Sequence, residues 1–178
     1  MIFTETKLKG AFIIDVQKLE DERGFFGRSW CKKEYEQHGL NPNIVQANIS
    51  YNRKKGTLRG MHYQVAPFSE CKTIRCITGS LYDVIIDIRP DSPTFKQWIA
   101  VELTAENFKT IYVPEGFAHG FLTLEDHTTV NYMVSGYYAP GAEAGIKFDD
   151  PAFNIEWPMK PSIISDKDNV LPYFVPLA

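Results

Sequence analysis

The chain has 178 residues, of which 44% are hydrophobic and 23% are charged, as in a soluble globular protein with one sizeable core. A formal net charge of −3 argues against a general nucleic-acid-binding protein, because such proteins are normally basic. Three cysteines are an odd number in no metal-ligand spacing, so a disulfide framework is not expected. No apolar run approaches a membrane span, and the N-terminus lacks a leader pattern, so we expect a cytoplasmic protein that does not associate with membranes.

The first fifty residues predict short strands and one helix. Extended segments are expected at residues 2–6 and 11–16, followed by the charged turn Asp21-Glu22-Arg23-Gly24. Residues 25–30 then place aromatic side chains beside Arg23 and Arg28, which suits either a strand with one wet face or a stacking surface with phosphate-binding cations. Residues 32–38 predict a short polar helix that Gly39 caps. Residues 45–50 predict a strand that shows Gln46 and Asn48 on one face.

Residues 57–64 carry an unusual density of polar function for a strand, with one guanidinium, one imidazole, one phenol and one amide. Gly60 lets the backbone bend, so we expect the alternation of faces to break there. Arg59 and His62 would then both serve one cavity. The alternative is a half-exposed strand with polar residues on its wet face.

Further strands follow at intervals of about 8–12 residues, which is typical of a sandwich, jelly roll or barrel. With no internal repeat or linker, residues 1–178 are expected to form a single all-β domain. The chain is loop-rich from about Pro140, where Glu143, Lys167 and Asp168 are the ionisable groups of most interest. The predicted later strands are residues 72–77, 81–89, 98–103, 110–113, 117–124 and 129–134.

Several motifs together resemble a known family. Pro114-x-Gly116-x-x-His119 resembles the second half-motif of the cupins, a jelly-roll superfamily, although His62-Tyr63-Gln64 stands where metal cupins have His-x-His. Over nearly its whole length the chain is similar to the dTDP-4-dehydrorhamnose 3,5-epimerases, which are metal-free cupins. Among the matching motifs are Asp21-x-Arg23-Gly24-x-Phe26, Gln46-x-Asn48, Leu58-Arg59-Gly60-x-His62-Tyr63-Gln64, Asp87-Ile88-Arg89, Asp149-Asp150-Pro151, Ile155-x-Trp157-Pro158 and Ser165-x-Lys167-Asp168.

The resemblance implies a cupin-type jelly roll with no metal and no cofactor, and a role for individual residues. His62 would be the base, paired with Asp168. Tyr132 would be the acid on the opposite face of the sugar, and Lys72 would stabilise the enolate. The implied substrate-binding residues are Arg23, Phe26, Arg28, Gln46, Asn48, Arg59, His119, Tyr138, Glu143 and Lys167, with Arg23 and Arg59 on phosphates and Tyr138 on the base. A homodimer is implied as well, in which N-terminal strands complete the partner's site.

The sequence departs from this family at two places. Arg28 stands where the family usually has a glutamate that contacts substrate. Residues 67–71 differ from the small, amide-containing loop that usually precedes the lysine at position 72. Both departures bear on the identity of the nucleotide or sugar, whereas the catalytic set is intact.

The expected reaction follows from carbonyl chemistry. A keto group at C4 acidifies the hydrogens on C3 and C5 of a nucleotide-linked 4-keto-6-deoxy sugar. A neutral imidazole suits the base, and a lysine near the C4 oxygen supplies electrostatic stabilisation. The expected function is therefore epimerisation at C3 and C5. Alternatives are a single-site epimerase or ketoisomerase, a non-catalytic sugar-nucleotide-binding cupin, and a metal-dependent cupin oxygenase, which Gln64 disfavours.

Overall fold

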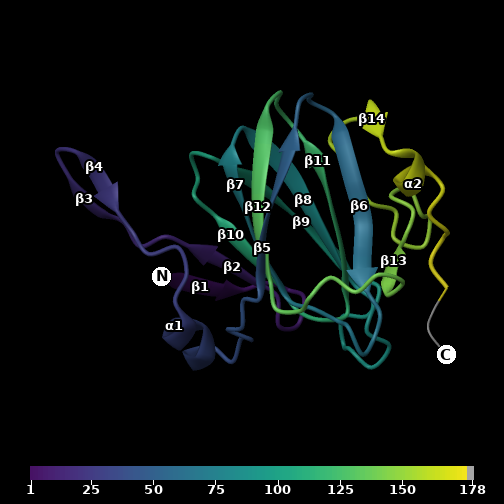
Figure 1. The fold of residues 1–178 in the computed structure, drawn as a ribbon, viewed down its shortest axis with the longest axis horizontal. Coiled ribbons are helices and arrows are strands. Elements are labelled where there is room, and N and C mark those ends of the chain that lie inside the picture. Colours follow the sequence, from purple (N-terminus) through teal and green to yellow (C-terminus); the bar gives the residue numbers. More distant parts are fainter. Residues whose placement is uncertain (176–178) are drawn as a thin grey trace.

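The computed structural model describes residues 1–175, which form two largely antiparallel sheets facing each other (Figure 1). The first sheet has the order β1 (Ile2–Glu5), β2 (Phe12–Asp15), β10 (Thr110–Val113), β7 (Lys72–Thr78), β12 (Thr128–Val134) and β5 (Gln46–Asn52). The second has the order β13 (Glu143–Gly145), β6 (Thr57–Gln64), β11 (Phe117–Thr123), β8 (Ser80–Asp87) and β9 (Trp98–Thr104), and β14 (Ile163–Ile164) pairs with β6. The predicted all-β class is confirmed.

The core lies between the two sheets, where the inward side chains of both meet. Ile74 of β7, Ile85 of β8 and Ile111 of β10 are fully buried there. Strand β8 is buried along almost its whole length, because its other face is covered by the C-terminal segment through Phe153 and Trp157. The alternation of β8 also turns Asp83 toward the interior, on the same side as Ile85.

Two helical segments complete the fold. The predicted polar helix is confirmed as α1 (Lys32–Gln37). The chain leaves it at Gly39, which has a φ of +70°. Tyr35 of α1 is fully buried against the outer face of the first sheet, near Tyr112. Helix α2 (Asp166–Asn169) lies beside β6 (Figure 1), so the C-terminal segment folds back onto the barrel. No helix within residues 1–175 is long and apolar enough to cross a membrane.

Gly60 breaks the alternation of β6 as predicted. It has a φ of +116°, a conformation that glycine adopts at little cost. A Cβ atom at this position would lie 2.6 Å from the Cα of Gly120 on the neighbouring strand. The register between β6 and β11 shifts at the same place. As a result, Arg59 and His62, which are three positions apart, line one cavity.

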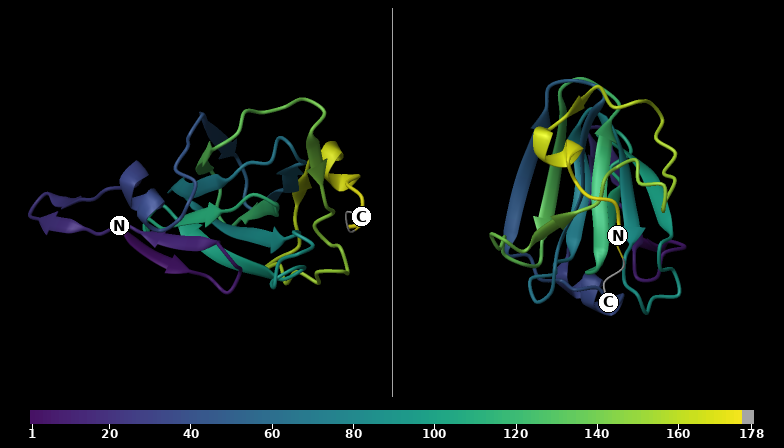
Figure 2. Two further views of the ribbon diagram at one scale, coloured as in Figure 1. Left: turned by 90° about the horizontal axis from the view of Figure 1, so that it is seen from below. Right: turned by 90° about the vertical axis from the view of Figure 1, so that its right-hand side faces the viewer.

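A small hairpin of β3 (Leu19–Asp21) and β4 (Gly24–Phe26) projects from the body of the molecule (Figures 1 and 2). All six of its strand residues are exposed, and Phe26 is 73% exposed. Leu19, which stands opposite Phe26 in the hairpin, is 63% exposed, so the two side chains present a small apolar patch to solvent.

Candidate active site

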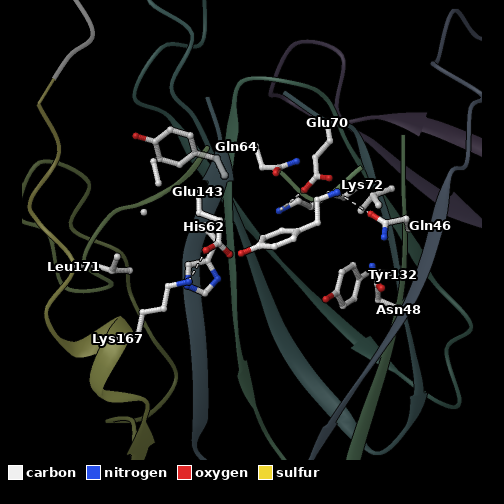
Figure 3. Close-up of a pocket in the computed structure, with 15 residues that line it drawn as sticks. Gln46, Asn48, His62, Gln64, Glu70, Lys72, Tyr132, Glu143, Lys167 and Leu171 are labelled. Atoms are coloured by element: carbon white, nitrogen blue, oxygen red, sulfur yellow. Dashed lines mark hydrogen bonds and ion pairs between the residues drawn. The ribbon is translucent and has the colours of Figure 1, made fainter. Parts of the chain in front are cut away.

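Two adjoining cavities of about 310 and 450 Å³ open between the sheets. They share His62 from β6, Lys72 from β7, Tyr132 from β12 and Lys167 from α2. Figure 3 shows His62 and Tyr132 on opposite sides of the first cavity, with Lys72 and Glu70 between them. A flat ring bound here would therefore meet an imidazole on one face and a phenol on the other.

His62 and Asp168 form a close pair although they are 106 positions apart in the chain. The Nε2 atom of His62 lies 2.7 Å from Oδ1 of Asp168, whose side chain is 5% exposed. Ser165 caps α2 by accepting a hydrogen bond from the Asp168 amide, and the Gly60 amide donates to Oδ2 of Asp168 at 3.1 Å. With the carboxylate ionised, Nε2 carries the proton and Nδ1 keeps its lone pair.

The surroundings of His62 favour its neutral form. Partial burial lowers the pKa of His62, and the charge and hydrogen bond of Asp168 oppose this effect. The net direction is downward, so the imidazole is unprotonated near neutral pH. It can therefore accept a proton, and Asp168 stabilises the imidazolium that results.

Tyr132 faces the cavity from a strand that is paired on both sides, with β5 and with β7. Burial raises the pKa of Tyr132, and the negative charge of Glu70 acts in the same direction while Arg59 opposes it. The phenol therefore holds its proton at neutral pH and can donate it to a carbanion.

Lys72 lies at the first position of β7 with its side chain only 13% exposed. Its Nζ is 3.6 Å from Oε1 of Glu70, which is itself 11% exposed. Burial lowers the pKa of Lys72, and the carboxylates of Glu70 and Asp83 oppose that effect. A cation in such a low-dielectric site can stabilise an oxyanion strongly.

A second histidine–carboxylate pair lies on the wall of the larger cavity. His119 Nε2 is 2.9 Å from Oδ2 of Asp83, which is fully buried. His119 stands opposite His62 in the register of β11 and β6, so both imidazoles reach the same region. Asp83 orients the His119 ring in the way that Asp168 orients that of His62.

Arg59 lies at the exposed side of the larger cavity and is held by neutral groups. Its Nε donates to Oδ1 of Asn52 at 2.8 Å, and its Nη2 donates to the carbonyl of Tyr51 at 3.4 Å. Within residues 1–175 it forms no ion pair with a carboxylate. Its charge is therefore available to an anionic ligand.

The structure brings together most of the residues that the sequence pointed to. Glu143 and Lys167 form an ion pair of 2.8 Å at the rim, and Gln46 accepts a hydrogen bond from the Tyr138 amide at 2.8 Å. The predicted residues that line the two cavities are Gln46, Asn48, Arg59, His62, Lys72, His119, Tyr132, Tyr138, Glu143, Lys167 and Asp168.

Three predicted substrate contacts lie outside the cavities of their own chain. Arg23 is 84% exposed on the projecting hairpin and pairs with Asp21. Phe26 is on the same hairpin. Arg28 pairs with Glu34 of α1 at 3.0 Å, so it does not reach the site within this subunit. A role for these three in substrate binding stays a prediction and requires a second subunit.

Two polar residues that line the smaller cavity, Gln64 and Glu70, are not among the predicted site residues. Gln64 is buried, and its side chain holds the loops at the rim of the smaller cavity. Its Nε2 donates to the carbonyls of Phe68 and Tyr137, and its Oε1 accepts from the Ala139 amide. Glu70 lies in the segment that departs from the family, and this departure was the available signal. Among residues 1–175, no three His, Cys, Asp or Glu side chains converge as a metal site requires; the absence of a cofactor stays a prediction.

The barrel and its cavity define a cupin-type jelly-roll enzyme of the acid–base class. A family model described as dTDP-4-dehydrorhamnose 3,5-epimerase matches residues 5–175. The enzyme of that name from Shigella flexneri is 42% identical over 165 residues, covering 92% of this chain and 91% of the relative. The chain belongs to the dTDP-4-dehydrorhamnose 3,5-epimerase family, and the predicted enzyme class, an epimerase, is confirmed.

Two solved structures that are similar to this chain are of enzymes from the same family. The dTDP-4-dehydrorhamnose 3,5-epimerase of Bacillus anthracis with TDP and PPi bound is 43% identical, with a TM-score of 0.93 and coverage of 97% of this chain and 99% of that one. The epimerase of Legionella pneumophila in complex with dTDP-4-keto-L-rhamnose is 37% identical, with a TM-score of 0.89 and coverage of 97% and 92%. The cupin-type jelly-roll fold is thereby confirmed.

Proposed function

We propose that this enzyme converts dTDP-4-dehydro-6-deoxy-D-glucose to dTDP-4-dehydro-L-rhamnose by inverting C3 and C5. The observation that carries the proposal is the His62–Asp168 pair on one side of the cavity and Tyr132 on the other, with Lys72 between them. The nucleotide sugar is supported by the Legionella relative, which holds dTDP-4-keto-L-rhamnose.

Each inversion uses these groups in turn. The Nδ1 atom of His62 takes the proton from the carbon next to the C4 carbonyl. The C–H electron pair forms a double bond to C4, and the carbonyl π pair moves onto the C4 oxygen, which gives an enolate. The ammonium of Lys72 stabilises the negative charge on the C4 oxygen. Tyr132 then delivers a proton to the same carbon from the opposite face, which inverts it. Solvent returns both residues to their starting protonation states.

Binding of the nucleotide is assigned to the open side of the site. Arg59 has no carboxylate partner among the described residues and suits a phosphate oxygen. Tyr138 is 55% exposed at the rim, where its ring can stack on a base. The Bacillus relative holds TDP, the nucleotide part of the proposed substrate.

A homodimer completes the proposed site. The projecting hairpin carries Arg23 and the exposed Phe26, which line neither of the two cavities described among residues 1–175. We assign this hairpin to the cavity of a second subunit, where Arg23 adds a second phosphate-binding cation and Arg28 reaches the rim. The exposed Ile49 and Tyr51 of edge strand β5 give such a partner an apolar surface to cover.

The reaction is tested by proton NMR of dTDP-4-dehydro-6-deoxy-D-glucose with the enzyme in deuterated water. The proposal predicts deuterium at both C3 and C5 and formation of the L-rhamno product. Deuterium at C3 alone would identify a single-site epimerase. Binding with no exchange at either carbon would identify a non-catalytic sugar-nucleotide-binding protein.

A further inference from the structure

Glu70 is a buried carboxylate inside the catalytic cavity to which the proposed reaction assigns no step. It lies two residues before Lys72, and its side chain is 11% exposed. Its Oε1 is 3.6 Å from Nζ of Lys72 (Figure 3). A carboxylate is seldom buried unless it pairs with a charge or binds a ligand. Its place on the cavity wall therefore calls for a role in the site.

The loop that carries Glu70 is held by contacts that do not use its carboxylate. The Cys71 amide donates to Oγ of Ser135 at 2.8 Å, and the Ser135 amide donates to the Cys71 carbonyl at 3.1 Å. The amide of Gln64 donates to the Phe68 carbonyl at 3.1 Å. The fold of this loop is thus secured by its backbone. The carboxylate of Glu70 is not one of these contacts, and it pairs with Lys72 in the cavity.

Lys72 is surrounded by ionisable groups from several elements. Asp83 of β8 is the other carboxylate that acts on it, and Asp83 is already paired with His119 at 2.9 Å. The other ionisable groups that line the two cavities are Tyr51, Arg59, His62, Tyr63, His119, Tyr132, Tyr138, Glu143, Lys167 and Asp168. Among residues 1–175, Glu70 is the one carboxylate within ion-pair distance of Lys72.

The effect of this pairing on Lys72 is chemically important. An ammonium buried without a counter-charge tends to lose its proton, and a neutral amine stabilises an enolate poorly. Burial lowers the pKa of Lys72, and Glu70 is the largest influence that opposes it. Burial also raises the pKa of Glu70 itself, against the charge of Lys72. The two groups favour each other's charged form.

We propose that Glu70 is a positioning residue for Lys72. The carboxylate of Glu70 holds the buried ammonium of Lys72 on the cavity wall and keeps it cationic, so that it can stabilise the enolate oxygen. This inference rests on the proposed function, in which Lys72 stabilises the charge on the C4 oxygen. Glu70 acts through Lys72, whereas His62 and Tyr132 carry out the proton transfers.

The test compares the pH dependence of kcat for the wild type, Glu70→Gln and the exposed control Glu106→Gln. Glutamine keeps the shape of the side chain and removes its charge. The alkaline limb of the Glu70→Gln profile should move to lower pH, so that the ratio of kcat at about pH 9 to kcat at about pH 7 falls about tenfold. Glu70→Asp should restore part of that ratio. The control should follow the wild type.

A second measurement does not depend on turnover. The ¹³Cε resonance of Lys72, assigned by its loss in Lys72→Met, should titrate at lower pH in Glu70→Gln than in the wild type. An unchanged Lys72 titration would overturn the inference even if the alkaline limb moves, because the charge of Glu70 also raises the pKa of Tyr132. A rise in KM without either change would also overturn it and make Glu70 a sugar contact. Absence of turnover in the wild type would instead refute the proposed function, and the NMR titration would still decide the role of Glu70.

Discussion

At the scale of single residues, the activity depends on the protonation states of a few side chains. Partial burial lowers the pKa of His62, whereas Asp168 opposes this shift. A base acts only when unprotonated, so activity is lost as the pH falls through the pKa of His62. Removing the charge of Asp168 lowers that pKa further and moves the acid limb to lower pH.

Asp168→Asn should therefore lower kcat about 10²-fold or more, because the imidazolium loses its stabilising charge and the ring loses its preferred tautomer. The acid limb of the kcat/KM profile should lie at lower pH than in the wild type. Steady-state kinetics across the acidic range measure both effects. A variant with normal kcat, or with its acid limb at higher pH, would contradict the assignment.

Arg59 offers a separate prediction about binding. Arg59→Met keeps the aliphatic part of the side chain and removes the charge assigned to the nucleotide phosphates. The dissociation constant of TDP should rise about tenfold or more, since hydrogen bonds to charged groups contribute about 1.5–3 kcal/mol. Isothermal titration calorimetry measures this change. Arg53→Met, at an exposed position of the adjacent turn, is the control and should bind TDP normally. Equal affinities of the two variants would refute the phosphate role.

At the scale of elements, the site depends on one irregular strand pair. Gly60 and Gly120 bring β6 and β11 close enough that neither position has room for a side chain. The bend at Gly60 aligns Arg59 and His62 on one cavity. Helix α2 then reaches this bend, because the Gly60 amide donates to Asp168. The conformation of Gly60 thus determines where the side chains of Arg59, His62 and Asp168 point.

Gly60→Ala should reduce the free energy of unfolding by about 2–3 kcal/mol more than Gly141→Ala. Both glycines have a positive φ, but a Cβ at Gly141 meets open space whereas a Cβ at Gly60 meets the backbone of Gly120. The difference therefore isolates the close approach of the strands from backbone strain. Urea denaturation followed by fluorescence gives both values. Similar losses for the two variants would contradict the packing described for β6.

The sequence predicted the strands well because their hydrophobic alternation is local. Buried Ile74 and Cys76, with the half-buried Arg75 between them, show the period of two directly. The His62–Asp168 pair was predicted from the family resemblance alone, because no local pattern connects residues 106 positions apart. Glu70 was not singled out, since it lies in a loop without periodicity. Arg23 and Phe26 lie on a hairpin that projects from the barrel, so no strand pattern places them relative to a cavity.

At the scale of the whole molecule, the exposed hairpin and the open cavity suggest two halves of one site on two subunits. Co-expression of Arg23→Ala with His62→Asn tests this arrangement. A mixed dimer has one cavity that combines an intact His62 with an intact hairpin, so activity should return to about a quarter of the wild-type value in a random mixture of two-fold dimers. The two variants expressed separately should each be impaired. Failure of co-expression to raise activity would show that the hairpin does not serve the partner's cavity.

The proposed reaction depends on a base and an acid that act on opposite faces of the sugar ring. Its most direct test follows hydrogen exchange and inversion separately by NMR in deuterated water, with wild type, His62→Asn and Tyr132→Phe. Tyr132→Phe should still exchange the acidic ring hydrogens, because His62 can return a deuteron from the same face, but it should not form the inverted product. His62→Asn should show neither. Full exchange in His62→Asn, or inversion at the wild-type rate in Tyr132→Phe, would contradict the assignment of the two faces.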